Sequence, residues 1–290
     1  VLQYCLPIKI KILSAVFLLF TINSLFAQNY YLYVASESDD TVSLLKFDGN
    51  KISEEKRIDV GFYPTEIEGP HGITVDPNGK FWYLTLAHGN PYGKIIKYST
   101  KDNIAIDQTT LGLFPASMQV SKITGFIYCV NFNLHGDMKP SSVSVIDAET
   151  MTEITKIKTG SMPHGSRISK DGLKQYSVAM MSGELFEIDA LSLKVSRKLD
   201  LENHSLMDHS KMDMSDNKMK HSSVKPTWVI PHPNKPLAYV TGNGSNEIIE
   251  INLNKWEVSR RIKIEKNPYN VEISPNGKFM VATLKGNGKT

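Results

Sequence analysis

The residues best suited to metal chemistry in this chain are methionines and histidines gathered between positions 203 and 223. Positions 204–221 hold three of the eight histidines and four of the eleven methionines, with almost no other apolar residue. Thioether sulfur favours Cu(I), and imidazole binds either Cu(I) or Cu(II). We therefore expect a loop insertion that binds copper weakly, with His204, Met207, His209, Met212, Met214, Met219 and His221 as its candidate ligands.

Another interpretation of this insertion stays open. A polar loop with oxidisable methionines and no bound metal has the same composition. Structural zinc is disfavoured, because the chain has no spaced quartet of cysteines and histidines.

A second set of candidates surrounds two histidines that directly follow a proline. His71 and His164 each stand in a Pro-His-Gly triplet. We expect a structural role, with each imidazole capping a loop carbonyl next to one mouth of a central channel. The functional alternative is a metal or substrate site at that mouth, on which the candidate side chains converge. The full candidate set is His71, His164, Met162, Arg167 and Trp228.

Carboxylates close to these positions suggest less. Glu66, Glu68 and Glu272 match no specific catalytic pattern, and we expect them to be solvated or to lie at strand ends.

Both triplets belong to a repeat that must position them. Five similar segments start at a proline, and these prolines are 45, 48, 63 and 42 residues apart. The 63-residue spacing contains the Met/His insertion. A period of about 40–50 residues built from strands is typical of propeller blades. The five segments are 70–77, 115–122, 163–170, 226–233 and 268–275.

Each repeat predicts four short strands. Runs of β-branched and aromatic residues alternate with Asn, Asp, Gly and Pro turns such as Asp76–Gly79, and no helical period appears after the first thirty residues. A single such sheet cannot bury both its faces, so neighbouring sheets must stack around an axis. We predict an all-β fold, a β-propeller of four-stranded antiparallel blades spanning 28–290.

The repeat resembles that of the YVTN-type β-propeller proteins. Tyr239–Asn243 reads Tyr-Val-Thr-Gly-Asn, and the Pro-His-Gly starts, Pro-Asn-Gly turns and Ile-Asp strand ends also match over about residues 30–290. The resemblance implies architecture more than activity, since similar propellers serve as adhesins, lactonases, electron-transfer subunits and uncharacterised exported proteins. The insertion at 207–212 also looks like segments of periplasmic copper-handling proteins.

The Pro-His-Gly units are also similar to those in the propeller of nitrous-oxide reductase, where histidines hold a copper–sulfide cluster. Outside the insertion this chain has only five histidines, and it lacks the paired-histidine run of that family. We therefore do not expect a multinuclear cluster. The five are His71, His88, His135, His164 and His232.

The ends of the sequence predict an incomplete ring. The first unit begins at its second strand, with strands expected at 30–35, 41–47 and 56–60. Position 1 is Val, and the sequence stops at Thr290 in the turn after a second strand. We expect a fragment that represents about six blades, the last one incomplete. The full-length protein is expected to have seven.

Residues 1–27 predict a cleaved signal peptide. Lys9 and Lys11 precede an apolar stretch, 12–26, which is too short to span a bilayer and ends in Ser24-Leu25-Phe26-Ala27. We expect cleavage after Ala27 and a periplasmic or secreted protein without stable membrane insertion. An uncleaved anchor is the alternative.

Charge and cysteine content narrow the function classes. Thirty-three basic and thirty acidic residues give a net charge of +3, and loss of Lys9 and Lys11 leaves +1. That balance does not favour nucleic acid as a partner. Without Cys5 the mature chain keeps only Cys129, which excludes an internal disulfide and is expected to be a buried apolar residue.

These features favour an exported, non-enzymatic propeller that acts as a binding scaffold. Copper, or a copper-handling protein, is the expected partner of the insertion, and a further protein partner stays unidentified. Two alternatives remain open. One is a periplasmic metal-dependent oxidoreductase or lactonase-like enzyme that uses the channel mouth, and the other is a cell-surface interaction module without metal.

Overall fold

The computed structural model describes residues 29–89, 91–202 and 221–286. The described chain divides into two compact units. One holds residues 29–34 and 43–57, and the other holds 35–42 together with the described residues from 58 onward. The predicted signal peptide lies outside the described residues, as does most of the Met/His insertion.

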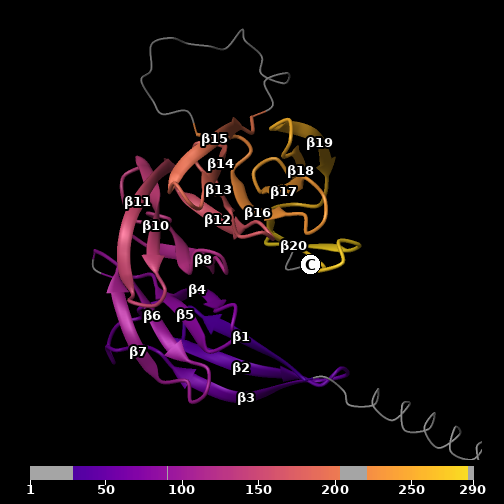
Figure 1. The fold of residues 1–290 in the computed structure, drawn as a ribbon. Coiled ribbons are helices and arrows are strands. Elements are labelled where there is room, and N and C mark those ends of the chain that lie inside the picture. The colour runs from indigo at the N-terminus through magenta and orange to yellow at the C-terminus, as the bar shows by residue number, and fades with distance from the viewer. Residues whose placement is uncertain (1–28, 90, 203–220, 287–290) are drawn as a thin grey trace, which may run out of the picture. The chain divides into compact units, whose positions relative to one another are not determined.

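The described residues form strands arranged in six antiparallel sheets, with no helix among them. These sheets are the blades of a β-propeller, which confirms the predicted fold class (Figure 1). Four sheets have four strands, one has three and the last has two, as expected for about six blades with an incomplete last one. The described residues include no helix whose length and apolar character would let it span a membrane.

The first sheet has the order β1-β2-β3 and occurs where the sequence predicts strands. Its members are β1 (Tyr30–Ser36), β2 (Thr41–Phe47) and β3 (Ile52–Asp59). The expected start of β3 at Lys56 is wrong by four residues. Asp48 Oδ1 accepts the backbone N–H groups of Asn50 and Lys51, at 2.9 and 2.8 Å, so the turn closes early and the chain is already extended at Ile52.

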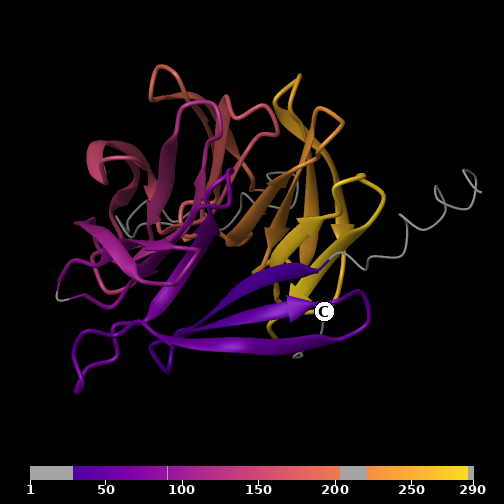
Figure 2. The same ribbon diagram turned by 60° about the horizontal axis from the view of Figure 1, so that its bottom comes forward.

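The later sheets repeat one order, in which the first strand begins at the repeat proline. These first strands are β4 (Pro70–Val75), β8 (Pro115–Val120), β12 (Pro163–Ile168), β16 (Pro226–Pro231) and β20 (Pro268–Ile273). Each packs against the first strand of the next sheet, from β4 to β20. Figure 2 shows the same sheets from a second direction.

The middle strands of the four-stranded sheets are mostly buried on both faces because neighbouring blades cover them, whereas the second strand of the last, two-stranded sheet is largely exposed. The second strands are β5 (Phe81–Leu86), β9 (Phe126–Asn131), β13 (Lys174–Ala179), β17 (Leu237–Gly242) and β21 (Met280–Leu284). The third strands are β6 (Lys94–Ser99), β10 (Pro140–Asp147), β14 (Glu184–Asp189) and β18 (Glu247–Asn252). Strands β5 and β9 therefore read as nearly continuous apolar runs instead of alternating ones.

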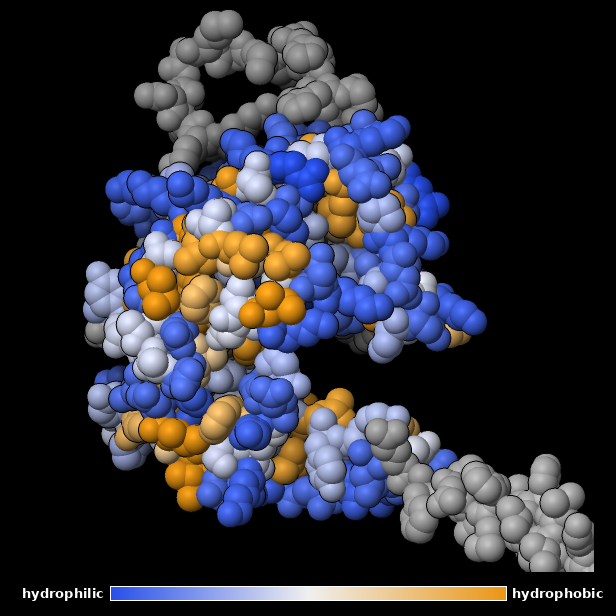
Figure 3. Space-filling view, viewed as in Figure 1, coloured by the Kyte–Doolittle hydropathy of each residue, from blue (hydrophilic) through white to orange (hydrophobic). Residues whose placement is uncertain are grey.

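The fourth strands alternate between buried and exposed residues, as expected at an outer edge. They are β7 (Ala105–Thr110), β11 (Thr152–Ser161), β15 (Lys194–Asp200) and β19 (Glu257–Lys263). Strand β15 reads Lys-Val-Ser-Arg-Lys-Leu-Asp, with Lys194, Lys198 and Asp200 on the exposed face and Arg197 on the partly buried one. Charged edges of this kind disfavour pairing with other chains. In Figure 3, hydrophilic residues dominate the surface over β17–β19.

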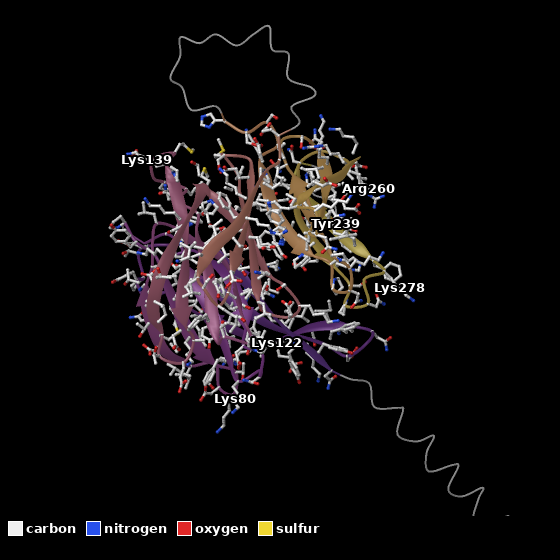
Figure 4. All side chains as sticks on the ribbon, turned by 45° about the horizontal axis from the view of Figure 1, so that its top comes forward. Lys80, Lys122, Lys139, Tyr239, Arg260 and Lys278 are labelled. Carbon is white, nitrogen blue, oxygen red and sulfur yellow. The ribbon has the colours of Figure 1, made fainter. Side chains whose placement is uncertain are left out.

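The turns of the second unit lie at two opposite ends of its strands. Lys80 and Lys122 belong to the turns that follow β4 and β8, whereas Lys139 precedes β10 at the other end. Figure 4 shows Lys80 and Lys139 on opposite sides of the sheets. The repeat prolines open the first strands, so Pro-His-Gly lies at the Lys139 end.

Candidate functional site

A cavity of about 320 Å³ lies where the first strands begin. Its walls come from β4, β8, β12, β16 and β20, so five successive blades each contribute side chains. We call it the strand-start cavity. Its main lining residues are His71, Met118, His164, Arg167, Trp228, Tyr269 and Asn270.

Two backbone features aim these side chains. The residue before each repeat proline has a positive φ, from 46° at Lys225 to 66° at Gly69. Each first strand then carries one extra residue relative to its partner strand, a β-bulge directly after the proline. Bulges twist a strand locally and redirect its side chains. In each of the five blades, at least one of the two residues after the proline lines the cavity.

The glycine of each Pro-His-Gly triplet is required by the next blade. A Cβ atom on Gly72 would lie 1.9 Å from the carbonyl oxygen of Ala116, and one on Gly165 would lie 2.4 Å from Cα of Trp228. Backbone from the following first strand fills the space that a side chain would need. The triplet thus reflects close packing between blades.

Side chains and carbonyls link successive blades at this level. The carbonyl of the residue after each repeat proline accepts a hydrogen bond from the preceding blade. Thr85 Oγ1 donates to Ala116 O at 3.4 Å, the Ser117 hydroxyl donates to His164 O, and Thr227 Oγ1 donates to Tyr269 O at 2.7 Å.

His164 supplies the remaining link in this series. Its Nδ1 lies 2.7 Å from the carbonyl oxygen of Thr227, which can only accept, so Nδ1 carries the proton. Its Nε2 is then the acceptor for the hydroxyl of Tyr269, also at 2.7 Å. The residue is 3% exposed. Burial lowers the pKa of His164 to about 4, although the bond to Thr227 opposes the shift. The imidazole is therefore neutral at pH 7, with both nitrogens occupied.

His71 has a different environment, although it stands in the same repeat position. Its Nδ1 lies 3.3 Å from Glu37 Oε2, and Nε2 of His88 lies 2.9 Å from Glu37 Oε1. The His71 side chain is 25% exposed. Burial lowers the pKa of His71, while the neighbouring Glu37 raises it in part. Burial also works to raise the pKa of Glu37, but the hydrogen bonds and charges of His88 and His71 outweigh it and lower that pKa.

Glu37 therefore sets the tautomer of His71. An ionised carboxylate only accepts hydrogen bonds, so Nδ1 of His71 and Nε2 of His88 both face it as donors. Nε2 of neutral His71 keeps its lone pair as a hydrogen-bond acceptor. His71 lines the strand-start cavity and packs edge-on against Phe114, with ring centroids 5.2 Å apart.

Arg167 and Trp228 form one charged wall. The guanidinium carbon lies 4.5 Å from the centroid of the indole ring, Nη2 pairs with Glu272 Oε1 at 2.6 Å, and Nη1 donates to Ser166 O at 3.0 Å. These contacts hold the guanidinium in one orientation, and its remaining N–H groups stay available to donate hydrogen bonds.

Tyr269 lines the cavity, and Lys285 lies next to Tyr269 without being a lining residue. Lys285 Nζ lies 4.6 Å from the centroid of the Tyr269 ring. The charge of Lys285 helps to lower the pKa of both His71 and His164, so it acts on the cavity. Burial raises the pKa of Tyr269, which keeps its hydroxyl protonated. Because the hydroxyl of Tyr269 donates its hydrogen bond to His164, its oxygen can only accept hydrogen bonds from other groups.

The predicted channel-mouth residues are only partly brought together. His71, His164, Arg167 and Trp228 line one cavity, whereas Met162 is not among its lining residues. Met162 is buried instead in an apolar cluster with Phe114, Val130 and Phe132. Its φ of 53° places it at the turn into β12, where its side chain packs inward.

The predicted copper ligands lie largely outside the described residues. These are His204, Met207, His209, Met212, Met214 and Met219. His221 is described and is exposed, just ahead of β16. Within residues 29–89, 91–202 and 221–286, no group of three His, Cys, Asp or Glu side chains is arranged to hold a metal ion. In the strand-start cavity, His164 could bind a metal through Nε2 only in place of its hydrogen bond to Tyr269, with Nδ1 still donating to Thr227 O.

Sequence reasoning missed three members of this site. Tyr269 occupies the same repeat position as His71 and His164, so an alignment of the repeats could have identified it as a site residue. Lys285 follows Leu284, the partner of repeat proline Pro268. Glu37 comes from the turn between β1 and β2, and no sequence pattern pairs it with His71.

One carboxylate also departs from expectation. Glu68 was expected to be solvated or at a strand end, but it is 6% exposed. Its side chain accepts the backbone N–H groups of Phe62 and Tyr63 and lies 3.4 Å from Lys94 Nζ. Glu68 thus holds a loop in place. The expectation failed because these partners are backbone groups, which no residue type reveals.

A second, larger cavity of about 570 Å³ lies at the opposite ends of β4 and β8, and we call it the turn groove. It contains charges of both signs, including Asp76, Lys97, Lys122 and Asp147. Lys97 Nζ donates to the carbonyls of Ala148 and Glu149, at 2.7 and 3.2 Å. Asp76 and Asp147 accept backbone N–H groups of their own turns. The turn groove is used as a reference surface in the experiments proposed for the strand-start cavity.

Comparisons with known proteins support the fold and leave the family open. No protein-family profile matches the sequence, and no curated protein matches it. Among solved structures, hydrazine synthase from Kuenenia stuttgartiensis has a TM-score of 0.71 at 16% identity, covering 89% of this chain and 78% of that chain. A streptogramin B lyase structure has a TM-score of 0.65 at 16% identity, covering 88% and 73% respectively.

A functionally unknown protein from Desulfotomaculum acetoxidans has a TM-score of 0.64 at 11% identity, covering 89% of this chain and 79% of that chain. At identities this low, the likeness shows the β-propeller fold alone. The YVTN-type character therefore stays a resemblance in the sequence.

Proposed function

We propose that this protein is an exported, non-enzymatic β-propeller that binds a small ligand in the strand-start cavity. One observation carries the proposal: five successive blades place His71, Met118, Arg167, Trp228 and Tyr269 around one hollow of about 320 Å³. A few convergent polar groups among apolar walls are typical of ligand sites, and this volume is at the small end of their range.

The contacts of the reactive side chains favour binding over catalysis. Nucleophilic catalysis needs a hydroxyl or thiol beside a free base. The hydroxyls of Ser117 and Thr227 donate to carbonyls of the next blade, and His164 has both nitrogens engaged. Cys129 is fully buried, and burial raises the pKa of its thiol.

A blocking substitution tests the cavity directly. Asn270→Trp would place an indole in the strand-start cavity, and Lys122→Trp would place the same group at the turn groove. A library of small polar compounds is screened against the unmodified protein by ligand-observed NMR. We expect hits whose signals vanish with Asn270→Trp and persist with Lys122→Trp. Hits that survive Asn270→Trp, or no hits at all, would overturn the proposal.

Export remains a proposal that rests on residues 1–27. Basic residues followed by a short apolar stretch and Ala27 support it. The chain is expressed in a bacterium and its periplasmic fraction is subjected to N-terminal sequencing. Gln28 as the first residue is the expected result, and an intact leader in the membrane fraction would favour the anchor.

Copper binding by the insertion is a second candidate function, supported by its unusual composition. Three histidines and four methionines between 204 and 221 form a ligand set suited to Cu(I). Cu(I) is titrated against a competing chelator, using the protein with and without residues 204–221. Loss of binding in the deletion variant is expected, whereas unchanged stoichiometry would overturn this candidate.

A further inference from the structure

The strand-start cavity and its immediate surroundings offer positively charged donors and neutral acceptors. Arg167 stacks on Trp228 in the lining, and Lys285 lies over the ring of Tyr269 next to the cavity. An aromatic face orients a cation but does not neutralise it, as a carboxylate does. No carboxylate lies within ion-pair distance of Lys285 among the described ion pairs, and Glu272 pairs with Arg167 through one oxygen. Arg167 and Lys285 thus present hydrogen-bond donors that carry positive charge.

Two of the neutral groups of the cavity, His71 and Tyr269, present only acceptors. The ionised Glu37 holds Nδ1–H of His71, which leaves the Nε2 lone pair of that residue. The bond between Thr227 O and His164 fixes the second imidazole, which then takes the proton of the Tyr269 hydroxyl. Tyr269 Oη is left with lone pairs alone. A ligand that satisfies this side must donate.

From this division, and resting on the proposed binding function, we propose that the ligand is a small organic acid with a hydrogen-bond donor near its carboxylate. Its carboxylate lies between Arg167 and Lys285, and its hydroxyl or amino group donates to Nε2 of His71 or to Tyr269 Oη. Hydroxy acids and amino acids share this chemistry. Their apolar portion contacts Met118 and the ring of Trp228.

Volume and charge limit the alternatives. A cavity of about 320 Å³ admits small molecules but no folded partner. A neutral ligand leaves the charge of Lys285 unmatched, and an anion without a donor leaves the lone pairs of His71 and Tyr269 without partners. Buried polar groups without partners reduce affinity. A ligand with both a carboxylate and a hydrogen-bond donor pairs with the cations and with the acceptors.

Three matched series of probes test the ligand class by calorimetry at pH 7.5. The hydroxy acids are lactate, 2-hydroxyisocaproate and mandelate. Each is compared with its amino acid (alanine, leucine or phenylglycine), with its acid lacking the donor (propionate, isocaproate or phenylacetate) and with the methyl ester of the hydroxy acid. We expect the hydroxy or amino acid of at least one series to bind at least about tenfold more tightly than its ester and its donor-free acid.

Substitutions test the cations and the acceptors separately. Lys285→Glu is expected to weaken binding of the acid about tenfold and Lys285→Gln about fivefold, since Lys285 is exposed and these changes leave the core intact. Arg167→Gln is expected to weaken it at least about tenfold. His71→Phe and Tyr269→Phe each remove one acceptor, so in at least one of these variants the preference of the binding hydroxy or amino acid over its donor-free acid should fall to about one. Lys122→Glu, in the turn groove, is the matched control and should change nothing.

The outcomes distinguish this inference from the proposed function. If esters bind as tightly as acids and Asn270→Trp abolishes both, the cavity is a ligand site but the ligand is not an acid. If the acids bind and Lys285→Glu has no effect, the carboxylate lies elsewhere and the inference fails. If no probe binds, the inference is overturned, and the wider compound screen alone then decides whether the cavity binds a ligand.

Discussion

The two Pro-His-Gly copies use the same three residues in different ways. In the β12 copy, His164 is buried, neutral and hydrogen-bonded through both nitrogens to later blades. In the β4 copy, His71 is partly exposed and faces Glu37 in the turn between β1 and β2. The carbonyl that corresponds to Thr227 O is Ala116 O, and Thr85 already donates to it.

The difference shows that a repeat position fixes where a side chain starts and its neighbours decide its chemistry. His164 lies beside Tyr269 and Thr227, so it becomes part of the blade-to-blade links. His71 lies beside a carboxylate and keeps one nitrogen available for the cavity. A shared motif therefore justified grouping the two histidines by location, but not by role.

The largest expected effect tests what the two copies have in common. Gly165→Ala and Gly72→Ala each force a Cβ against backbone of the next first strand, at 2.4 and 1.9 Å. Overpacking against backbone costs about 3 kcal/mol or more. Urea unfolding should show a similar loss of unfolding free energy for both variants. Gly79→Ala is the control for a glycine with open space around it, although its φ of +68° adds some strain.

The next effect separates the two copies. His164→Ala removes two buried hydrogen bonds and leaves Thr227 O and the Tyr269 hydroxyl without partners. We expect a loss of about 3 kcal/mol in unfolding free energy. His71→Ala removes a more exposed side chain and should cost about 1 kcal/mol. Urea unfolding of both variants checks this. Equal losses would mean that the two imidazoles have the same structural role.

The pH dependence of stability gives a smaller, related effect. The folded pKa of His164 is about 4, below its ordinary value of 6.5. The unfolded state therefore binds more protons between these values, and the contribution of neutral His164 is present above pH 6.5 and is lost as the pH falls through this window. At pH 5 we expect a loss of about 2 kcal/mol relative to pH 7.

A conservative variant isolates this contribution. His164→Asn keeps a donor for Thr227 O but cannot titrate. Unfolding free energies at pH 7, 6 and 5 should fall less steeply for this variant than for the unmodified protein. Parallel slopes would show that other groups cause the acid sensitivity.

The fold was predictable because its signals are local and repeated. A starting proline, a polar turn after the first strand and a second strand rich in apolar residues recur in each of the five proline-led blades. A repeat averages out ambiguity in any single strand. The error at the start of β3 arose where one side chain, Asp48, closes the turn early.

The candidate site was predictable only to the level of location. The repeat alignment placed His71, His164, Arg167 and Trp228 at one end of the blades, and they do line one cavity. Met162 was grouped with them by sequence proximity, but the positive φ before the proline turns its side chain into an apolar cluster. Glu37 and Lys285 come from the turn after β1 and the end of β21, and only the fold brings them to the cavity.

The smallest expected effect sharpens the comparison at its weakest contact. Glu37→Gln removes the charge beside His71 and His88, but Glu37 is exposed enough that the change in unfolding free energy should stay within about 0.5 kcal/mol.

The informative measurement is an NMR titration of the imidazole protons. Because Glu37 raises the pKa of His71 against the effect of burial, the pKa of His71 should fall further in the variant. The pKa of His164 should not move, because Glu37 does not contribute to its shift. Asp137→Asn, on an exposed loop where Asp137 pairs with Lys139, controls for general loss of negative charge. An unchanged His71 pKa would show that Glu37 does not set its protonation, and Nε2 of His71 would then no longer be fixed as an acceptor toward the cavity.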